Sequence, residues 1–198
     1  RYISVTGVQT CALPILAIPP EEAGKAFARL GGAKILVLQN EVPGAVNVAV
    51  ARQAKSAGAR VILNAAPARP LSTELIEIID ILVVNRVEAA MLAGVPVEGS
   101  EDAMGALSAL SQTRRDVIIT LGGSGLVVGP KDQRAEFIPA TPVEVVSTHG
   151  AGDCFIGALS IALARGDTLE GAAAYASRIA ARFVSLSETA REQIDFKA

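Results

Sequence analysis

Residues 35–64 read ILVLQNEVPGAVNVAVARQAKSAGARVILN, and this stretch decides the fold class. It opens with the aliphatic run Ile35 to Gln39, which predicts a buried strand. A helix is expected from Pro43 to Ala57, because proline is favoured in a first helical turn and Gly58 supplies a stop. Val61 to Asn64 then predicts a second strand. Strand, helix and strand in this order form the unit from which parallel sheets are built.

The same alternation continues toward the C-terminus. Strands are expected at 81–84 and 117–120, and helices at 72–79, 87–93, 100–112, 152–165 and 169–183. Three later runs separated by Gly, Pro and Asp predict an antiparallel meander, at 126–128, 135–138 and 143–146. We therefore expect a single α/β domain with a mostly parallel sheet, helices on both faces and a late antiparallel extension.

Composition narrows the class of protein. Hydrophobic residues make up 51% of the 198 residues and charged residues 19%, which predicts a packed core and excludes a disordered chain. Lys and Arg number 18 against 20 Asp and Glu, and no basic cluster is dense enough for nucleic acid. No apolar run approaches the roughly 18–20 residues of a membrane helix. Two cysteines, Cys11 and Cys154, cannot form a disulfide framework, which favours the reducing cytoplasm. Together these observations predict a cytoplasmic protein without nucleic-acid or membrane partners.

Residues 1–15, RYISVTGVQTCALPI, do not fit the pattern of the rest. They show neither helical period nor clean alternation, and polar residues interrupt any signal-peptide core. The string VTGVQTCALPI resembles translated sequencing-adapter DNA; the alternative is a genuine N-terminal arm. We therefore expect a non-native segment at 1–15 and place the domain at 16–198.

The sharpest candidate site is the segment from Thr148 to Asp153, THGAGD, directly before an apolar helix. Its glycines would let backbone N–H groups converge at a helix N-terminus, where unpaired donors and the helix dipole favour an anion. Asp153 in the first turn could accept a proton from an attacking hydroxyl. The alternative is an ordinary glycine turn followed by a first-turn acid.

A second glycine-rich turn, Thr120 to Gly125, follows a predicted strand and could lie along phosphates. Its alternative is a tight connection between two strands. Neither turn matches G-x-x-x-x-G-K-[ST] or G-x-G-x-x-G. Ser147, His149 and Asp153 include the residue types of a hydrolase triad, but no G-x-S-x-G elbow supports them. A single histidine and no cysteine pair also disfavour zinc.

Five segments of the chain carry a resemblance to a known family. They are LQNEVPG (38–44), LNAAPAR (63–69), DILVVNRVEA (80–89), ITLGGSG (119–125) and STHGAGDCFIGAL (147–159). With them the chain resembles the phosphofructokinase-B-type sugar kinases, and within these the ribokinase branch. The segment at 147–159 fits the family signature D-T-x-G-A-G-D-x-F-x-G-A at nearly every position. The resemblance implies a three-layer α/β/α ribokinase-like fold.

The resemblance also implies roles for individual residues. Asp153 matches the general base that deprotonates the sugar hydroxyl, and Gly150, Ala151 and Gly152 match the anion hole around the transferring phosphoryl group. Glu41 matches a sugar-contacting carboxylate, and Glu88 a magnesium ligand acting through water. The residues implied to bind ATP are Asn85, Thr120, Leu121, Gly122, Gly123, Ser124, Gly125, Gly152, Asp153 and Ser177.

Several positions depart from the family pattern. Ser147 stands where an Asp usually helps to hold an activating monovalent cation with nearby carbonyls, so a potassium site at Ser147 and His149 stays open. Ser177 replaces an Asn that often contacts adenine, and SLSETAR at 185–191 replaces the usual glycine-containing turn. The lid strands, a G-G-K-G-A-N-like segment and a sugar-gripping Asp are absent from this sequence. Family members often dimerise through that lid, which implies a homodimer for a full-length parent.

We therefore expect an ATP- and Mg²⁺-dependent sugar kinase that converts D-ribose to ribose 5-phosphate. The sequence looks like the C-terminal two-thirds of such an enzyme, without the N-terminal part and lid, and we expect the fragment alone to be inactive. The alternatives are a non-catalytic nucleotide-binding remnant, or a family kinase acting on fructose-type sugars, nucleosides or hydroxymethylpyrimidine.

Overall fold

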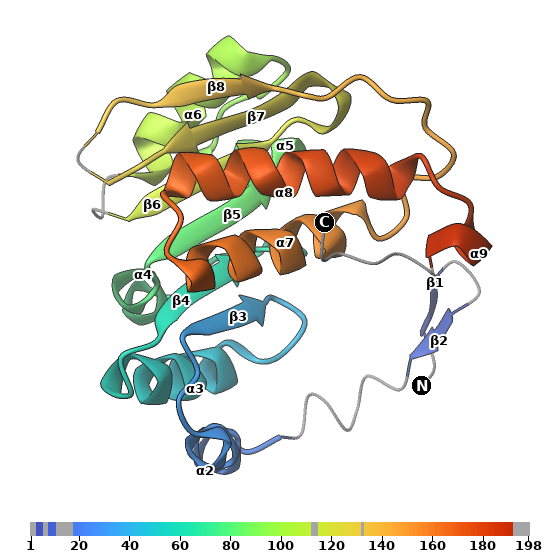
Figure 1. Cartoon of the computed structure of the whole chain (residues 1–198). Helices are drawn as coiled ribbons and strands as arrows, with labels where there is room; N and C mark the ends of the chain where they lie inside the picture. The colour runs from blue at the N-terminus through green and yellow to red at the C-terminus, as the bar shows by residue number, and fades with distance from the viewer. Residues whose placement is uncertain (1–2, 6–7, 11–17, 112–114, 132, 192–198) are drawn as a thin grey trace. The chain divides into compact units, whose positions relative to one another are not determined.

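The computed structural model describes residues 3–5, 8–10, 18–111, 115–131 and 133–191 (Figure 1). By its internal contacts the chain divides into two compact units, Arg1–Ile81 and Leu82–Ala198. The single domain expected from the sequence stays a prediction. No helix among the described residues is long and apolar enough to cross a membrane.

The first unit contains the strand–helix–strand stretch on which the fold prediction depends. Strand β3 (Ile35–Gln39) is followed by α3 (Gly44–Ser56) and β4 (Arg60–Asn64). The two strands pair in parallel, from Ile35 opposite Arg60 to Gln39 opposite Asn64. Helix α3 begins directly after Pro43 and ends before Gly58, whose φ of 81° lies in the left-handed region that glycine adopts easily. The sequence prediction is confirmed to within a residue or two.

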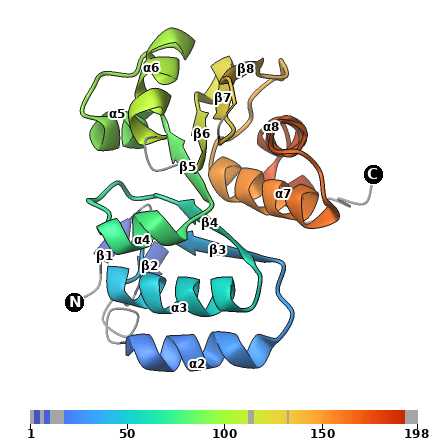
Figure 2. The same cartoon turned by 90° about the vertical axis from the view of Figure 1, so that its left-hand side faces the viewer.

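Two helices and a short pair of strands are the other described elements of the first unit. Helix α2 (Pro20–Leu30) packs along α3 with its buried Gly24 close to the Gln53 side chain (Figure 2). Helix α4 (Thr73–Ile78) is capped as predicted by Ser72, whose hydroxyl accepts a bond from the Leu75 amide at 3.2 Å. Strands β1 (Ile3–Val5) and β2 (Val8–Thr10) form a short antiparallel pair. The interpretation of residues 1–15 as non-native stays a prediction.

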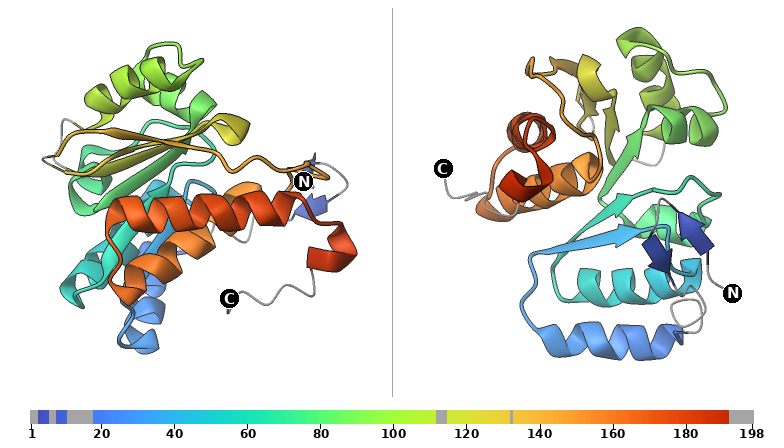
Figure 3. Two further views of the ribbon diagram at one scale, coloured as in Figure 1. Left: turned by 45° about the horizontal axis from the view of Figure 1, so that its top comes forward. Right: turned by 90° about the vertical axis from the view of Figure 1, so that its right-hand side faces the viewer.

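The second unit has three layers of its own. Its strands follow the order β5-β6-β7-β8, and the β6–β7 and β7–β8 pairs are antiparallel, as the sequence predicted for the late extension. Helices α5 and α6 cover one face of these strands, and α7 and α8 lie against the other (Figures 2 and 3). The bounds are β5 (Ile81–Asn85), α5 (Arg86–Ala93), α6 (Ser100–Leu110), β6 (Asp116–Thr120), the 3₁₀ turn η1 (Gly122–Ser124), β7 (Gly125–Gly129), β8 (Glu136–Pro139), α7 (Ala151–Arg165), α8 (Leu169–Val184) and α9 (Glu188–Arg191).

How deeply the residues of a strand are buried in the second unit depends on where the strand lies in the sheet. All five residues of β7 are buried, because this strand is paired on both edges and covered on its faces by α6 and α8. The first four residues of β5 are buried as well, while Asn85 at its carboxyl end is exposed. Polar residues therefore begin where the strands end, which is where ligands bind in open α/β sheets.

The predicted strand at 143–146 is wrong. Residues 141–146 form no strand, and the side chains of Val145 and Val146 are 56% and 60% exposed. The Val146 amide donates instead to the Val184 carbonyl at 2.9 Å, at the end of α8. The valine-rich composition suggested a strand, but adjacent exposed valines give no buried face, and the backbone donor is satisfied by a helix terminus.

Candidate functional site

The N-terminus of α7 is built to leave backbone donors accessible. Gly150 precedes the helix with a φ of 75°, and no side chain caps this helix end. The Ala151 amide donates to the Thr148 carbonyl at 3.1 Å, which closes the turn before the helix. Gly152 is exposed, and a Cβ there would meet nothing within 4 Å. An uncapped helix start with exposed glycine is suited to binding an anion.

Asp153 lies exposed in the first turn of this helix. The structure therefore places the predicted general base next to the predicted anion hole of Gly150, Ala151 and Gly152. A carboxylate at this position can accept a proton from a hydroxyl that approaches the same helix end.

The second glycine-rich turn folds tightly between β6 and β7. The Leu121 amide donates to the Gly125 carbonyl at 2.8 Å, and Gly122 and Gly125 have φ values of 59° and 119°. A Cβ at Gly125 would lie 2.2 Å from the Ile138 carbonyl oxygen of β8, so glycine is required there. Thr120 donates its hydroxyl proton to the Val84 carbonyl at 3.4 Å, which ties the end of β6 to β5.

The two glycine-rich segments meet in one pocket of about 250 Å³ in the second unit. Its lining is largely apolar, and the few polar residues in it include Thr120, Thr148 and Ser177. Of the residues predicted from sequence, the pocket is lined by Thr120, Gly122, Gly123, Gly125, Ala151, Gly152 and Ser177. A mostly apolar hollow that ends at a helix N-terminus can hold a flat ring at one end and a phosphate at the other.

Other wall residues of this pocket were missed by the sequence analysis. They come from the segment after β8 and from the last turns of α8, and they are Ala140, Thr141, Val143, Val145, Ala180, Ala181 and Val184. The sequence pattern predicted a strand at 143–146 and a helix at 169–183, and neither prediction indicated a ligand site at these residues. Their apolar character carried no functional signal by itself.

Asn85 and Glu88 lie at the start of α5 and are bonded to each other. The Asn85 side-chain oxygen accepts from the Glu88 amide at 2.9 Å, and Glu88 Oε2 accepts from the Asn85 amide at 2.8 Å. This capping box fixes the helix start, and the Glu88 residue is 7% exposed. The capping box does not use two side-chain atoms of this pair, Asn85 Nδ2 and Glu88 Oε1.

Arg191 of α9 organises the loop before the anion site. Its guanidinium donates to the carbonyls of Ser147 at 2.6 Å and His149 at 3.1 Å, and to the Phe183 carbonyl at 3.0 Å. The guanidinium carbon lies 4.3 Å from the centre of the Phe183 ring, in a cation–π arrangement. Sequence analysis did not single out Arg191, although it noted that the segment containing it departs from the family pattern.

Cys154 follows Asp153 on α7 and is half-buried. Burial raises the pKa of its thiol above the ordinary value, and the positive charge of Arg191 lowers it to a smaller extent. The thiol therefore favours its neutral form, which supports a packing role over a nucleophilic one.

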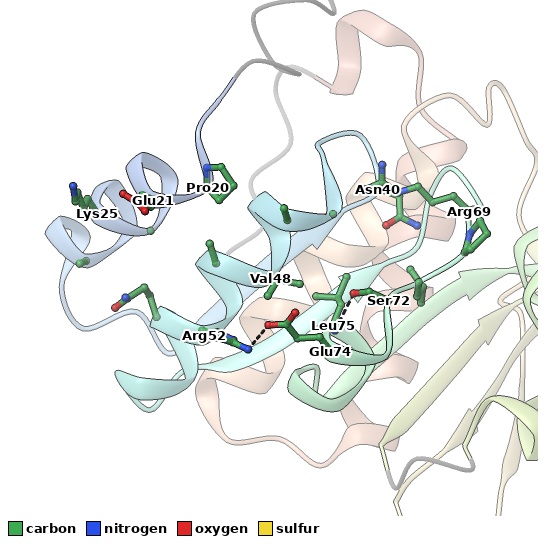
Figure 4. A pocket seen from close by; sticks show the side chains of 18 residues that line it. Pro20, Glu21, Lys25, Asn40, Val48, Arg52, Arg69, Ser72, Glu74 and Leu75 are labelled. Carbon is green, nitrogen blue, oxygen red and sulfur yellow. Dashed lines mark hydrogen bonds and ion pairs between the residues drawn. The ribbon is translucent and has the colours of Figure 1, made fainter.

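The first unit has a larger hollow of about 880 Å³, between α2, α3 and the segment leading into α4 (Figure 4). An ion pair between Arg52 and Glu74 crosses one end of it. Asn40 donates to the Pro67 carbonyl at 3.1 Å, and Arg69 donates to the Val42 carbonyl, so both side chains hold the loops around the strand ends. Glu41, the predicted sugar contact, is exposed directly after Asn40 and is not among the lining residues.

Comparison with known proteins places the chain in a family. The model of the pfkB family carbohydrate kinases matches residues 18–194. The ribokinase of Arabidopsis thaliana is 34% identical over 159 residues, 78% of this chain and 41% of that protein. The ribokinase of Staphylococcus aureus (strain COL) is 36% identical over 144 residues, 72% of this chain and 47% of that protein. The chain spans about half the length of the curated relatives it matches.

Solved structures agree with the sequence comparison. The structure of Arabidopsis thaliana ribokinase complexed with ribose and ATP matches with a TM-score of 0.77 at 28% identity, over 90% of this chain and 58% of that one. The Thermotoga maritima ribokinase matches with a TM-score of 0.69 at 29% identity, over 89% of this chain and 59% of that one. These matches confirm the expected three-layer α/β fold with a mostly parallel sheet. The chain belongs to the pfkB family of carbohydrate kinases.

Proposed function

We propose that this chain carries the nucleotide-binding and phosphoryl-transfer machinery of an ATP-dependent sugar kinase of the ribokinase branch. The observation that carries the proposal is the meeting of two glycine-rich turns in one pocket, beside an uncapped helix start that bears Asp153. The similarity to ribokinases, including one complexed with ribose and ATP, supports D-ribose as the acceptor and ribose 5-phosphate as the product.

In this proposal one end of the pocket binds the adenine of ATP and the other end binds its phosphates. The apolar walls take the adenine, Ser177 lies at their edge, and the turn from Thr120 to Gly125 runs along the phosphates. The first-turn amides of α7 that follow Ala151, whose own amide closes the turn to Thr148, face the γ-phosphate and stabilise the charge that develops during transfer.

Asp153 then acts as the general base. It takes the proton of the attacking sugar hydroxyl while that oxygen forms a bond to the γ-phosphorus and the bond from phosphorus to the β–γ bridging oxygen breaks. The products are a sugar phosphate and ADP. Glu41 contributes a carboxylate to the sugar, as the family resemblance implies.

Magnesium suits the atoms left over by the capping box of α5. Mg²⁺ keeps several waters and binds through one or two carboxylates together with substrate phosphates. Glu88 Oε1, the carboxylate oxygen that the capping box does not use, would hold such a water. The ion supplies charge neutralisation on the phosphates of ATP when bound.

The test is an Asp153→Asn substitution in the longest reading frame that contains these residues. Ribose-dependent ADP formation should fall by about 10²–10⁴-fold while ATP affinity, measured by calorimetry, changes little. Asp167→Asn is the matched control, because Asp167 is an exposed carboxylate outside the pocket, just before α8. Turnover of the Asp153 variant close to that of the control would contradict the assignment.

The alternative function is nucleotide binding without transfer. It is favoured by the distribution of the predicted residues, since Glu41 alone among them is a sugar contact that does not also serve the nucleotide. For the 198-residue chain itself we propose ATP binding without turnover. A panel of ribose, fructose, nucleosides and hydroxymethylpyrimidine separates the acceptors, and ADP release with any one of them from the purified chain would refute its inactivity.

A further inference from the structure

We infer that Arg191 is a built-in cation for the loop that precedes the anion hole, and that this chain therefore needs no monovalent metal ion there. The link to catalysis rests on the proposed function, since the loop matters for turnover if the start of α7 binds phosphate. The charge arrangement itself rests on geometry alone.

Three carbonyl oxygens point to one place in the second unit. They belong to Ser147 and His149, on the loop leading into α7, and to Phe183, near the end of α8. Carbonyl oxygens that converge in this way place the negative ends of several dipoles together, and a positively charged hydrogen-bond donor stabilises such a cluster. The Arg191 guanidinium does so with three of its five N–H donors.

The same guanidinium is connected to the anion hole through one aromatic ring. Arg191 lies over Phe183, and a Cβ on Gly150 would be 3.4 Å from that ring. His149, whose carbonyl Arg191 holds, is the residue before Gly150. Arg191 thus fixes both the backbone before Gly150 and the ring beside it, so we assign it as a positioning residue for the helix start.

A potassium ion does not fit the residues at this place. The side chain at position 147 is the neutral hydroxyl of Ser147, where the family resemblance implies an Asp, so this position supplies no carboxylate to neutralise the ion. The Ser147 and His149 carbonyls that would complete its shell already accept bonds from Arg191. A metal ion placed between them would also meet the repulsion of the guanidinium. The potassium site that the sequence analysis left open at Ser147 and His149 is therefore replaced by a side chain of the protein.

The experiment measures melting temperature and ATP affinity of the 198-residue chain in KCl and in tetramethylammonium chloride at equal ionic strength. Arg191→Ala removes the charge, and Arg191→Lys keeps a charge without the planar fork. Arg182→Ala is the matched control, because Arg182 is an exposed arginine in the last turn of α8. Millimolar guanidinium chloride is added in a third series to replace the lost group.

The wild-type chain should give the same Tm and, within about twofold, the same ATP affinity in both salts. Arg191→Ala should lower the Tm by roughly 5–10 °C and weaken ATP binding by about tenfold in both salts, with recovery on addition of guanidinium. The Tm and ATP affinity of Arg191→Lys should lie between those of the wild-type chain and of Arg191→Ala, and they should depend less on added guanidinium. This variant decides the question if the alanine variant does not fold. Arg182→Ala should behave as wild type.

Two results would overturn the inference. One is a wild-type Tm that rises on exchange of tetramethylammonium for potassium, which would show that a metal site exists after all. The other is an Arg191→Ala variant that matches Arg182→Ala in every salt. A wild-type chain that melts cooperatively but binds no ATP would refute the proposed function, and the melting series would still decide the role of Arg191.

Discussion

Two helix starts in the second unit show how one sheet edge serves two purposes. Helix α5 begins with a closed capping box, in which Asn85 and Glu88 each accept a bond from the other's amide. Helix α7 begins after Gly150 with no side-chain cap. The family resemblance assigns phosphate-related roles to both, but the geometry separates them. The polar atoms of the first are largely used within the chain, whereas the dipole of the second is left for a ligand.

The difference predicts that stability and binding respond differently at the two ends. A change at the start of α5 should act mainly on the free energy of unfolding, because it removes hydrogen bonds that exist without ligand. A change at the start of α7 should act mainly on nucleotide affinity. Substitutions at each end, with matched controls elsewhere, can confirm or break this contrast.

Gly150→Ala is expected to have the largest effect. Its φ of 75° costs an L-residue roughly 1–2 kcal/mol, and the new methyl would press on the Phe183 ring at 3.4 Å. We expect a Tm lower by roughly 2–8 °C and ATP binding weaker by about tenfold or more, measured by thermal melting and calorimetry.

Gly166→Ala is the control for that substitution. Gly166 ends the same helix with a φ of 98°, and a Cβ there would meet nothing within 4 Å. It should lose a similar amount of stability without loss of ATP affinity. If both variants bound ATP like wild type, the open helix start would not be the phosphate site.

The sequence predicted local structure well, but it did not predict contacts between residues that lie far apart in the chain. The unit from Ile35 to Asn64 was predicted closely, because aliphatic runs, an N-terminal proline and a glycine stop are all local signals. The meeting of Thr120–Gly125 with Gly152 agrees with the family resemblance, which implies that both segments bind ATP.

The features that were missed depend on contacts far apart in the chain. Arg191 reaches carbonyls more than forty residues away, at Ser147 and His149, and nothing near it in sequence indicates that. The segment 143–146 has strand-like composition, but its backbone donor at Val146 is taken by the end of α8. In both cases a hydrogen bond between residues far apart in the chain determines the local structure, and such a bond leaves no local signal in the sequence.

Asn85→Ala is expected to have an intermediate effect and tests the other helix start. Loss of the cap should lower the free energy of unfolding by about 1 kcal/mol, or a Tm drop of roughly 2–4 °C. Ser72→Ala, which removes the cap of α4, is the matched control for stability. ATP affinity with Mg²⁺ should change by no more than a few-fold in the Asn85 variant. A tenfold loss there, absent in the control, would make the start of α5 a ligand site equal to that of α7.

Gly152→Ala is expected to have the smallest effect on stability, and in the opposite direction to the others. Gly152 lies in the first turn of α7 with space around its Cα, so alanine should fit and stabilise the fold by about 0.4–1 kcal/mol. The same methyl would stand between the helix amides and a bound phosphate, so ATP affinity should fall by a few-fold even as the Tm rises. Gly157→Ala is the control, because Gly157 is an exposed glycine further along the same helix with nothing within 4 Å of an added Cβ. Gly157→Ala should raise the Tm and leave ATP affinity unchanged. Equal ATP affinities of the Gly152 and Gly157 variants would show that the nucleotide does not approach the start of α7.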